Sequence, residues 1–387
     1  MDKIPDGFAV IRNSQHHKTN LDFLYLCGVK VPNAVLIIDG QSRESHLFYS
    51  TTEDRLKGEG LSPLLATNPK EATGIEHWAK VDQFGPALKN RIGQGGILYT
   101  PHSAEESNHD VSTRSEWDGR LTRERQFVKV LKEKFPDIEV KDCSQIIWDI
   151  RLVKTPAEIE KMRIAAQIGA EAMNALMEAA KPGMWEYELA ALFEYECKKK
   201  GVKEMAFNLI ISSAENHKYL HYSQYNRYLT DGDFLVCDGG PAWEDYDTDI
   251  SISFPLNGKF TPRQKEIYEA CKEVSMACIE FYKPGVTGYD VGAKVKELMI
   301  QKGYDIETDA FSRLRFFKEG GITHSVGLAT HDCGGADVPK DMPLEAGMVF
   351  ACDVFATFPG EKLGVRVENT VLITENGCEN LSSGVRR

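Results

Sequence analysis

Two similar segments in the second half of the chain constrain its fold more than any other feature of the sequence. Segments 229–238 and 344–353 both begin with Leu, carry Gly at the fourth position and end in Cys followed by Asp. In each, an apolar run of strand length precedes the acidic residue, so we expect Asp238 and Asp353 at or near the end of a buried strand. The shared pattern indicates that the two aspartates occupy equivalent places in two copies of one unit.

The repeat extends upstream of both segments. Lys-Pro-Gly at 181–183 and at 283–285 is followed, 18 residues after its Gly, by Gly201 and Gly303 respectively. The apolar residues in between recur with a helical period. Two copies of turn, helix, loop, strand and acidic residue predict a pseudo-twofold domain with its site on the axis. A duplication kept only for packing does not explain the aspartates, because a buried unpaired carboxylate is costly and metal coordination is a common remedy.

Four carboxylates and one imidazole form a candidate ligand set for divalent cations. Asp238 and Asp249 are eleven residues apart, Asp353 and Glu368 are fifteen apart, and His324 lies between the pairs. This set suffices for two cations that share bridging carboxylates. Oxygen ligands with one histidine favour Mn²⁺, with Fe²⁺, Co²⁺ or Zn²⁺ as alternatives, and the lack of thiolate ligands argues against a structural zinc site.

Composition and charge exclude several classes of protein. A formal net charge of -12 over 387 residues argues against non-specific binding of nucleic acid or of an anionic membrane. No apolar run approaches the roughly 18 residues of a membrane span, and the first residues do not resemble a signal peptide. The nine cysteines form no Cys-x-x-Cys pair. We therefore expect reduced thiols in a cytoplasmic protein.

A domain boundary is expected near residue 150. Upstream, short apolar runs such as 34–39 and 96–99 alternate with turns and helical stretches, which predicts an α/β domain over residues 1–150. Downstream, Thr155-Pro-Ala-Glu158 forms a capping box with Pro at the first helical position, and it opens a long helix of a second domain over residues 151–387.

The histidines of the first domain show no tight constellation with acidic residues in the sequence. They are His16, His17, His46, His77, His102 and His109. The neighbouring pair of His16 and His17 suggests a metal site less strongly than it suggests a polar N-terminal segment. We therefore single out no metal ligand in residues 1–150.

The chain from about residue 150 to its C-terminus resembles the creatinase/prolidase/aminopeptidase P family. The motifs that carry the resemblance are the run IRLVKTPAEI at 150–159, His221-Tyr222, Asp238-Gly-Gly, segment 246–255, the run from His324 to Asp332, Gly347-Met-Val, and Gly364-Val-Arg366-Val-Glu368. Residues 1–150 resemble the family's N-terminal domain in length and pattern only. The resemblance implies an α/β N-terminal domain followed by an α+β pita-bread catalytic domain, whose curved, mainly antiparallel sheet is covered by helices and holds two metals.

The resemblance also implies roles for individual residues. The metal ligands would be Asp238, Asp249, His324, Asp353 and Glu368. His221 and His331 would flank the site without binding metal and would steady the tetrahedral intermediate. Arg366 would orient the carboxylates.

The implied activity is cleavage of the peptide bond before proline, by an Xaa-Pro aminopeptidase or dipeptidase. A hydroxide that bridges two divalent metals would attack the carbonyl, and Asp353 would accept its proton. The family also implies a homodimer in which the N-terminal domain of one subunit helps to close the other's site.

Three departures from the family pattern keep other functions open. Asp353 stands where the aminopeptidases carry Glu, Ile252 where Arg is usual, and Gly320 where a further His is frequent. They suggest a small-molecule substrate, as in the ectoine hydrolases (amidohydrolases) or the dimethylsulfoniopropionate lyases of this fold. A metal-free creatinase-like enzyme and a catalytically silent binding module are less consistent with the five retained ligands.

Single residues also have plainer explanations. Asp249 alone would fit a turn, His331 alone would fit a hydrogen-bonded structural histidine, and Asp353 alone would fit a strand end. Their joint occurrence in family order favours function. Asp247, two residues before Asp249, is better explained as a solvated residue than as an extra ligand.

Overall fold

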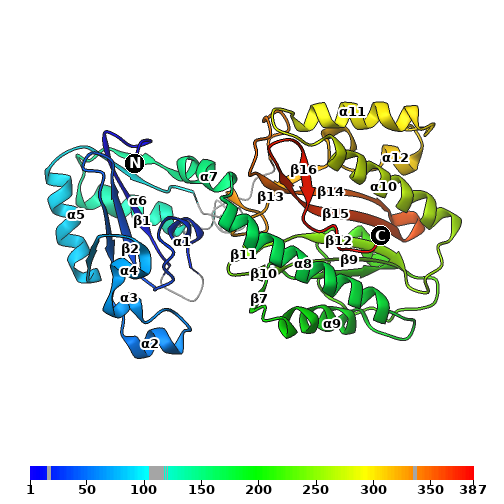
Figure 1. Cartoon of the computed structure of the whole chain (residues 1–387), viewed down its shortest axis with the longest axis horizontal. Coiled ribbons are helices and arrows are strands. Elements are labelled where there is room, and N and C mark those ends of the chain that lie inside the picture. The colour runs from blue at the N-terminus through cyan, green and yellow to red at the C-terminus, as the bar shows by residue number, and fades with distance from the viewer. Residues whose placement is uncertain (15–18, 104–116, 118, 120, 334–337) are drawn as a thin grey trace. The chain divides into compact units, whose positions relative to one another are not determined.

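The computed structural model describes residues 1–14, 19–103, 117, 119, 121–333 and 338–387. His16, His17 and His109 therefore lie outside the described residues. The chain forms two compact units, Met1–Arg151 and Leu152–Arg387 (Figure 1). Within the described segments, no helix combines the length and the apolar character that crossing a membrane requires.

The first unit is built on a six-stranded sheet in the order β4-β3-β2-β1-β5-β6. β1 pairs antiparallel with β2 and parallel with β5, and β3 pairs parallel with β4. The strands are β1 (Gly7–Arg12), β2 (Val35–Asp39), β3 (Ser45–Phe48), β4 (His77–Ala79), β5 (Ile97–Thr100) and β6 (Val140–Asp142). The helices are α1 (Leu21–Cys27), α2 (Glu53–Gly58), α3 (Leu64–Thr67), α4 (Pro69–Thr73), α5 (Phe84–Gly93), α6 (Arg123–Lys134) and α7 (Ser144–Leu152), with a 3₁₀ turn, η1 (Val81–Gln83). The α/β pattern expected for this part of the chain is present.

The second unit begins with the long helix that its capping box predicts. α8 (Pro156–Ala179) starts with the Thr155 hydroxyl accepting a hydrogen bond from the Glu158 amide, while the Glu158 carboxylate accepts one from the Thr155 amide at 2.7 Å. These reciprocal bonds satisfy two amides that would otherwise lack a partner at a helix start. The helix ends just before the Pro-Gly turn at 182–183.

The two sequence repeats fold alike. α9 (Glu186–Lys199) and α11 (Gly288–Gln301) both follow a Lys-Pro-Gly turn. They end shortly before Gly201 and Gly303, whose φ angles of 95° and 85° suit glycine. Each helix is preceded by a longer one, α8 in the first copy and α10 (Pro262–Phe281) in the second. The predicted internal repeat is confirmed at the level of its elements.

The main sheet of the second unit has the order β13-β14-β15-β12-β9-β8, with β16 added beside β15. Its strands are β8 (Ile210–Ser213), β9 (Phe234–Gly239), β12 (Ile250–Pro255), β13 (Ile322–Ser325), β14 (Val349–Phe358), β15 (Leu363–Ile373) and β16 (Cys378–Asn380). A smaller sheet contains β7 (Glu204–Met205), β10 (Pro241–Trp243) and β11 (Tyr246–Asp247). Short helices in the described part of this unit include α12 (Asp309–Ser312), η3 (Ala214–Lys218), η4 (Phe317–Glu319) and η6 (Pro359–Glu361). The two halves meet where β12 pairs with β15.

In Figure 1, α10 and α11 lie along one half of the main sheet, and α8 and α9 lie along the other half. Cys237 packs with residues of α8 and α9, and Cys352 packs with residues of α10 and α11. Because neighbouring side chains on a strand point to opposite faces, Asp238 and Asp353 point away from these helices. The recurring Cys-Asp pair therefore marks the change from the apolar face to the polar one.

The strand positions of the two aspartates correct one expectation. Asp238 lies one residue before the end of β9, as predicted. Asp353 instead lies in the middle of the ten-residue β14, because the apolar and aromatic residues that follow it continue the strand to Phe358.

Candidate metal centre

Four buried polar residues form a row across the face of the main sheet that points away from the helices. Ser251 on β12 is the direct partner of both Asp238 on β9 and Glu368 on β15. Glu368 is in turn the partner of Asp353 on β14. The pairing of the strands thus brings three carboxylates from both repeats side by side.

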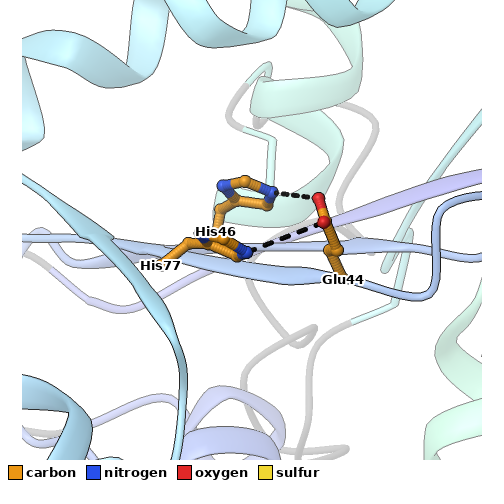
Figure 2. A group of neighbouring side chains, drawn as sticks. All are labelled: Glu44, His46 and His77. Carbon is orange, nitrogen blue, oxygen red and sulfur yellow. Dashed lines mark hydrogen bonds and ion pairs between the residues drawn. The ribbon is translucent and has the colours of Figure 1, made fainter.

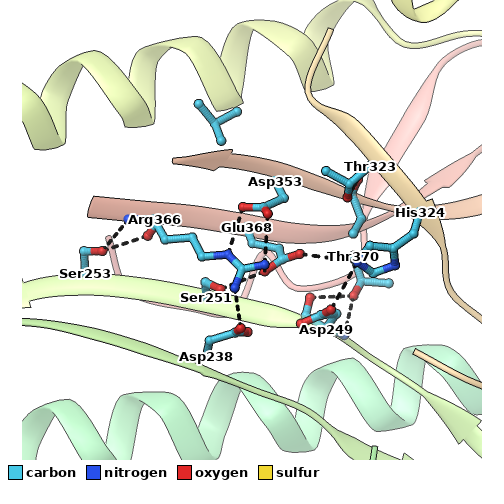
Figure 3. A network of polar contacts seen from close by, with 12 residues as sticks. Asp238, Asp249, Ser251, Ser253, Thr323, His324, Asp353, Arg366, Glu368 and Thr370 are labelled. Atoms are coloured by element: carbon cyan, nitrogen blue, oxygen red, sulfur yellow. Dashed lines mark hydrogen bonds and ion pairs between the residues drawn. The ribbon is translucent and has the colours of Figure 1, made fainter. Parts of the chain in front are cut away.

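Two further side chains complete the group on the same face. Asp249 precedes Ser251 by two residues, so it points to the same side of the strand. His324 Nε2, on β13, lies 3.6 Å from Asp249 Oδ2 and 4.0 Å from Glu368 Oε1. The ligand atoms of these three residues lie within 4.8 Å of one another, close enough to hold one cation. All five residues expected to bind metal therefore stand in one cluster (Figure 3).

The buried oxygens of this cluster test whether it suits a metal. The five side chains are between 0% and 7% exposed. Asp238 Oδ1, Asp249 Oδ1 and Glu368 Oε1 have no hydrogen-bond partner. An unpartnered buried carboxylate oxygen is strongly unfavourable, and a divalent cation with oxygen ligands would remove that cost for all three atoms. The residues present therefore fit a metal centre.

Arg366 lies among the carboxylates, and its hydrogen bonds connect the two repeats. Its Nη1 donates to Asp238 Oδ2 at 2.6 Å, while Nε and Nη2 donate to the two oxygens of Asp353 at 3.0 and 2.9 Å. Nη2 also lies 3.1 Å from Glu368 Oε2. Figure 3 shows the guanidinium between these three acidic side chains, with Asp249 and His324 on the far side of Glu368. The arginine therefore makes direct hydrogen bonds to carboxylates that are expected to bind metal.

Burial dominates the electrostatics of the cluster. It raises the pKa of Asp249 and of Glu368 well above the usual range, and it raises the pKa of Asp353 despite the opposing charge of Arg366. The same burial lowers the pKa of His324 well below its ordinary value, so its imidazole is neutral and able to bind a cation. Neighbouring positive charge favours ionised carboxylates, so bound cations would lower the acidic pKa values again.

Two hydroxyl residues that sequence reasoning missed hold the ligands in place. Ser251 Oγ donates to Glu368 Oε2 at 2.7 Å. Thr370 Oγ1 accepts from the Asp249 amide at 2.9 Å and lies 2.8 Å from the Asp249 carbonyl oxygen. Each follows a ligand by two residues along a strand, so each points to the same face as that ligand. The spacing of two residues from a predicted ligand is the sequence feature that could have identified Ser251 and Thr370.

The predicted flanking histidines differ in position. His331 is half-buried, and its ring centroid lies 4.1 Å from that of His324. His221 is exposed in the loop between η3 and β9, and among the described residues no hydrogen bond joins it to the five expected ligands. The structure therefore brings His331, but not His221, into direct contact with the cluster.

Asp247 and Asp332 are further acidic residues near the expected ligands, and both are buried. Asp247 was expected to be solvated, but it is 6% exposed and accepts a hydrogen bond from Thr330 Oγ1 at 3.1 Å. The expectation was wrong because β11 pairs with β10 inside the fold. Asp332 Oδ2 lies 3.5 Å from Lys154 Nζ, and both side chains are almost fully buried. This ion pair anchors the turn that carries His331.

Two of the three departures from the family pattern lie away from the polar row. Ile252 packs in the apolar cluster under α8 and α9, on the opposite face of β12 from Ser251. Gly320 has a φ of 77°, and a Cβ at this position would clash with the Gly288 carbonyl oxygen. Only the third departure, Asp353, is a member of the row.

The first unit contains one group of side chains that its sequence did not show. Glu44, His46 and His77 place one ligand atom each within 4.8 Å of one another. His46 and His77 are 31 residues apart in sequence, and the pairing of β3 with β4 brings them together. The first unit therefore does contain an acidic-histidine group.

Comparison with known proteins agrees with this geometry. The model of metallopeptidase family M24 matches residues 160–375, which include all five clustered side chains. The chain is 29% identical to Xaa-Pro aminopeptidase 3 of Mus musculus, over 95% of this chain and 74% of that protein. It is 32% identical to Xaa-Pro aminopeptidase of Haemophilus influenzae, over 94% of this chain and 84% of the relative.

Solved structures show the same fold. Aminopeptidase P from Escherichia coli with the inhibitor Pro-Leu superposes with a TM-score of 0.78 at 25% identity, over 98% of this chain and 91% of that one. The zinc-substituted form of the E. coli enzyme, in complex with product, gives the same TM-score. These likenesses confirm the expected fold, an α/β N-terminal domain followed by a pita-bread catalytic domain. Together with the match over more than half of the chain, they show that this protein belongs to metallopeptidase family M24.

Proposed function

We propose that this protein is a metal-dependent Xaa-Pro aminopeptidase or dipeptidase that cleaves the peptide bond before proline. The names of its relatives support this substrate class, since Xaa-Pro aminopeptidases match 94–95% of the chain. The observation that carries the proposal is the set of unpartnered buried oxygens on Asp238, Asp249 and Glu368. Asp249 and Glu368 also form, with a neutral His324, a group close enough to hold one cation.

Two divalent cations per chain fit this ligand set, with Mn²⁺ favoured and Fe²⁺, Co²⁺ or Zn²⁺ as alternatives. Asp249, His324 and Glu368 would hold one of them. Asp238 and Asp353 would complete the second position, with Asp249 and Glu368 shared. Bound there, the cations would supply Lewis-acid polarisation of the scissile carbonyl and a water of lowered pKa.

The chain's own residues supply the remaining functions. Asp353 would accept the proton of the attacking water, and Arg366 would hold its carboxylate in position. His331 lies beside the metal ligand His324 and would donate a hydrogen bond to the oxyanion. The family resemblance assigns the same role to His221, which lies in an exposed loop.

Assembly and location follow the family expectation. We infer a homodimer in which the first unit of each chain helps to close the other's site. All nine cysteines are free thiols, which supports a reducing, cytoplasmic setting.

A small-molecule amide remains the second candidate substrate, and Asp353 is the observation that favours it. Aspartate is one methylene shorter than the family's glutamate, and Arg366 engages both of its oxygens. The pocket would then be rebuilt for a substrate other than a peptide, as in the ectoine hydrolase-like or dimethylsulfoniopropionate lyase-like relatives.

A substrate panel separates the two hypotheses. The protein would be stripped of metal, reloaded with Mn²⁺ and offered Xaa-Pro dipeptides, Xaa-Pro-Xaa tripeptides, matched Xaa-Ala peptides and small cyclic and N-acyl amides. We expect release of the N-terminal residue from the Xaa-Pro peptides only. Turnover of an amide without cleavage of any Xaa-Pro peptide would transfer the proposal to the small-molecule alternative.

A further inference from the structure

A second group of metal-ligating side chains lies in the first unit, on an edge of its sheet. Glu44, His46 and His77 form this group, called here the edge cluster (Figure 2). It belongs to the α/β unit and shares no residue with the carboxylate row of the catalytic unit. The mechanism proposed above does not use it.

The strand pairing explains why these residues meet. β3 and β4 run parallel, and His46 is the direct partner of His77 in their register. Paired residues of neighbouring strands point to the same face and lie about 5 Å apart. Glu44 precedes His46 by two residues, so its side chain emerges on that same face. β4 is the outermost strand of its sheet, which leaves the cluster open to solvent.

The side chains converge on one point. The two imidazole rings stack with centroids 4.5 Å apart and an angle of 15° between their planes. His46 Nε2 lies 3.4 Å from Glu44 Oε2, and His77 Nε2 lies 3.7 Å from Glu44 Oε1. Figure 2 shows both contacts reaching the same carboxylate. The first contact is a long hydrogen bond and the second lies at ion-pair distance, so one nitrogen of each ring faces the carboxylate.

The separations are close to those of a tetrahedral metal site. Zn–N and Zn–O bonds of about 2.0–2.1 Å at tetrahedral angles place ligand atoms about 3.3 Å apart. The three side chains are 38–50% exposed, and rotation about their side-chain torsions is the adjustment that the proposed site requires. Two imidazoles and one carboxylate are also a ligand combination that zinc uses, with water in the fourth position.

We propose that the edge cluster binds one transition-metal cation of the Zn²⁺ class through Glu44, His46 and His77. Imidazole-rich sites prefer Zn²⁺, Cu²⁺ or Ni²⁺ to Mn²⁺, whereas the buried carboxylate row prefers harder cations. The protein therefore carries two kinds of site with different metal preferences. A cation held here ties the three-residue edge strand β4 to β3.

The test counts zinc on the full-length protein, with its central site first loaded with Mn²⁺. Wild type, His46→Gln and His77→Gln are dialysed against the same free Zn²⁺ concentration and analysed for bound metal. His102→Gln, which changes another histidine of the same unit, is the matched control. We expect each edge variant to bind one zinc equivalent fewer than wild type and control, because a lost ligand lowers affinity by at least about 10-fold.

A second readout places the cation on the strands. In wild type and in the control, Zn²⁺ slows amide hydrogen exchange in β4, and in His77→Gln it has no such effect. Glu44→Gln, which changes only an exposed side chain, weakens zinc binding without lowering the metal-free melting temperature. Equal zinc content in wild type and both histidine variants, or no zinc-dependent change of exchange in β4, would overturn the proposal.

Discussion

Arg366 holds Asp353 with two parallel hydrogen bonds, from Nε to Oδ1 at 3.0 Å and from Nη2 to Oδ2 at 2.9 Å. The third nitrogen of the same guanidinium donates to Asp238. Asp238 and Asp353 are the equivalent residues of the two repeats, so one planar group sets the distance between them. The pKa of Arg366 is raised well above its usual range by these carboxylates, against the effect of burial, which keeps it charged.

Replacing this arginine tests its positioning role. Arg366→Lys keeps the positive charge but loses the fork that engages both oxygens of Asp353. We predict that its Mn²⁺ affinity and turnover fall by about 10–100-fold, as expected when a group that orients metal ligands is lost. Arg263→Lys is the matched control, because Arg263 also binds carboxylates but on the surface. Unchanged metal affinity in Arg366→Lys would show that the fork does not position the ligands.

His331 is predicted to act on the oxyanion and not on the metal. His331→Ala should lower turnover by roughly 10²-fold or more while metal content is retained, since such stabilisation contributes about 2.7–4 kcal/mol. Asp249→Ala should lose metal and activity together, because it removes a shared ligand. Steady-state kinetics and elemental analysis on both variants measure the difference. Full activity in His331→Ala would refute the assigned role.

The substitution Asp353→Glu tests whether the site cleaves Xaa-Pro peptides or is adapted to a small-molecule substrate. The substitution restores the side chain usual in the aminopeptidases of this family. If the protein is an Xaa-Pro peptidase, we expect its cleavage of Xaa-Pro tripeptides to be preserved or raised. In a pocket shaped around aspartate, the longer side chain would misplace the attacking water, and a misplacement near 1 Å costs about 10²-fold. If the turnover of Asp353→Glu falls by that factor relative to wild type, the small-molecule hypothesis is favoured.

His217 predicts an acid dependence of stability. Burial lowers its pKa to about 4, and its Nε2 donates to the Phe234 carbonyl at 3.0 Å. The unfolded chain, with an ordinary value near 6.5, binds more protons than the folded chain between about pH 6.5 and 4. The contribution of neutral His217 to the free energy of unfolding is therefore complete above pH 6.5, and it is lost as the pH falls to 4.

The change in stability is large enough to measure. A pKa difference of this size corresponds to about 3 kcal/mol in the free energy of unfolding. We expect His217→Gln to flatten the pH dependence of that free energy between pH 6.5 and 4, in denaturant titrations of metal-free protein, while His102→Gln does not. Parallel curves for wild type and His217→Gln would contradict the assignment.

Local patterns in the sequence predicted the elements well. The capping box at Thr155 and the Pro-Gly turns before α9 and α11 depend on neighbouring residues, so they are visible in one chain. The apolar run before each Cys-Asp pair predicted a strand for the same reason. Asp238 and Asp353 were singled out because each repeat carries its own copy of the pattern. The choice of Asp249, His324 and Glu368 depended on the resemblance to the family.

Pairings between distant segments could not be predicted in the same way. Ser251 meets Glu368 only because β12 pairs with β15, and their residues are more than a hundred positions apart. His46 meets His77 only because an edge strand is added in parallel. The three bonds of Arg366 likewise depend on register between strands, which the hydrophobic pattern of one strand does not contain.

Metal content measures the central claim most directly. Wild-type protein would be stripped with a chelator, dialysed against Mn²⁺ and then metal-free buffer, and analysed for bound manganese. A cluster of four carboxylates and one histidine predicts about two equivalents per chain. The edge cluster adds little, because Mn²⁺ is the weakest binder of the divalent series at imidazole-rich sites. Near-zero manganese that renewed dialysis fails to restore would contradict the account.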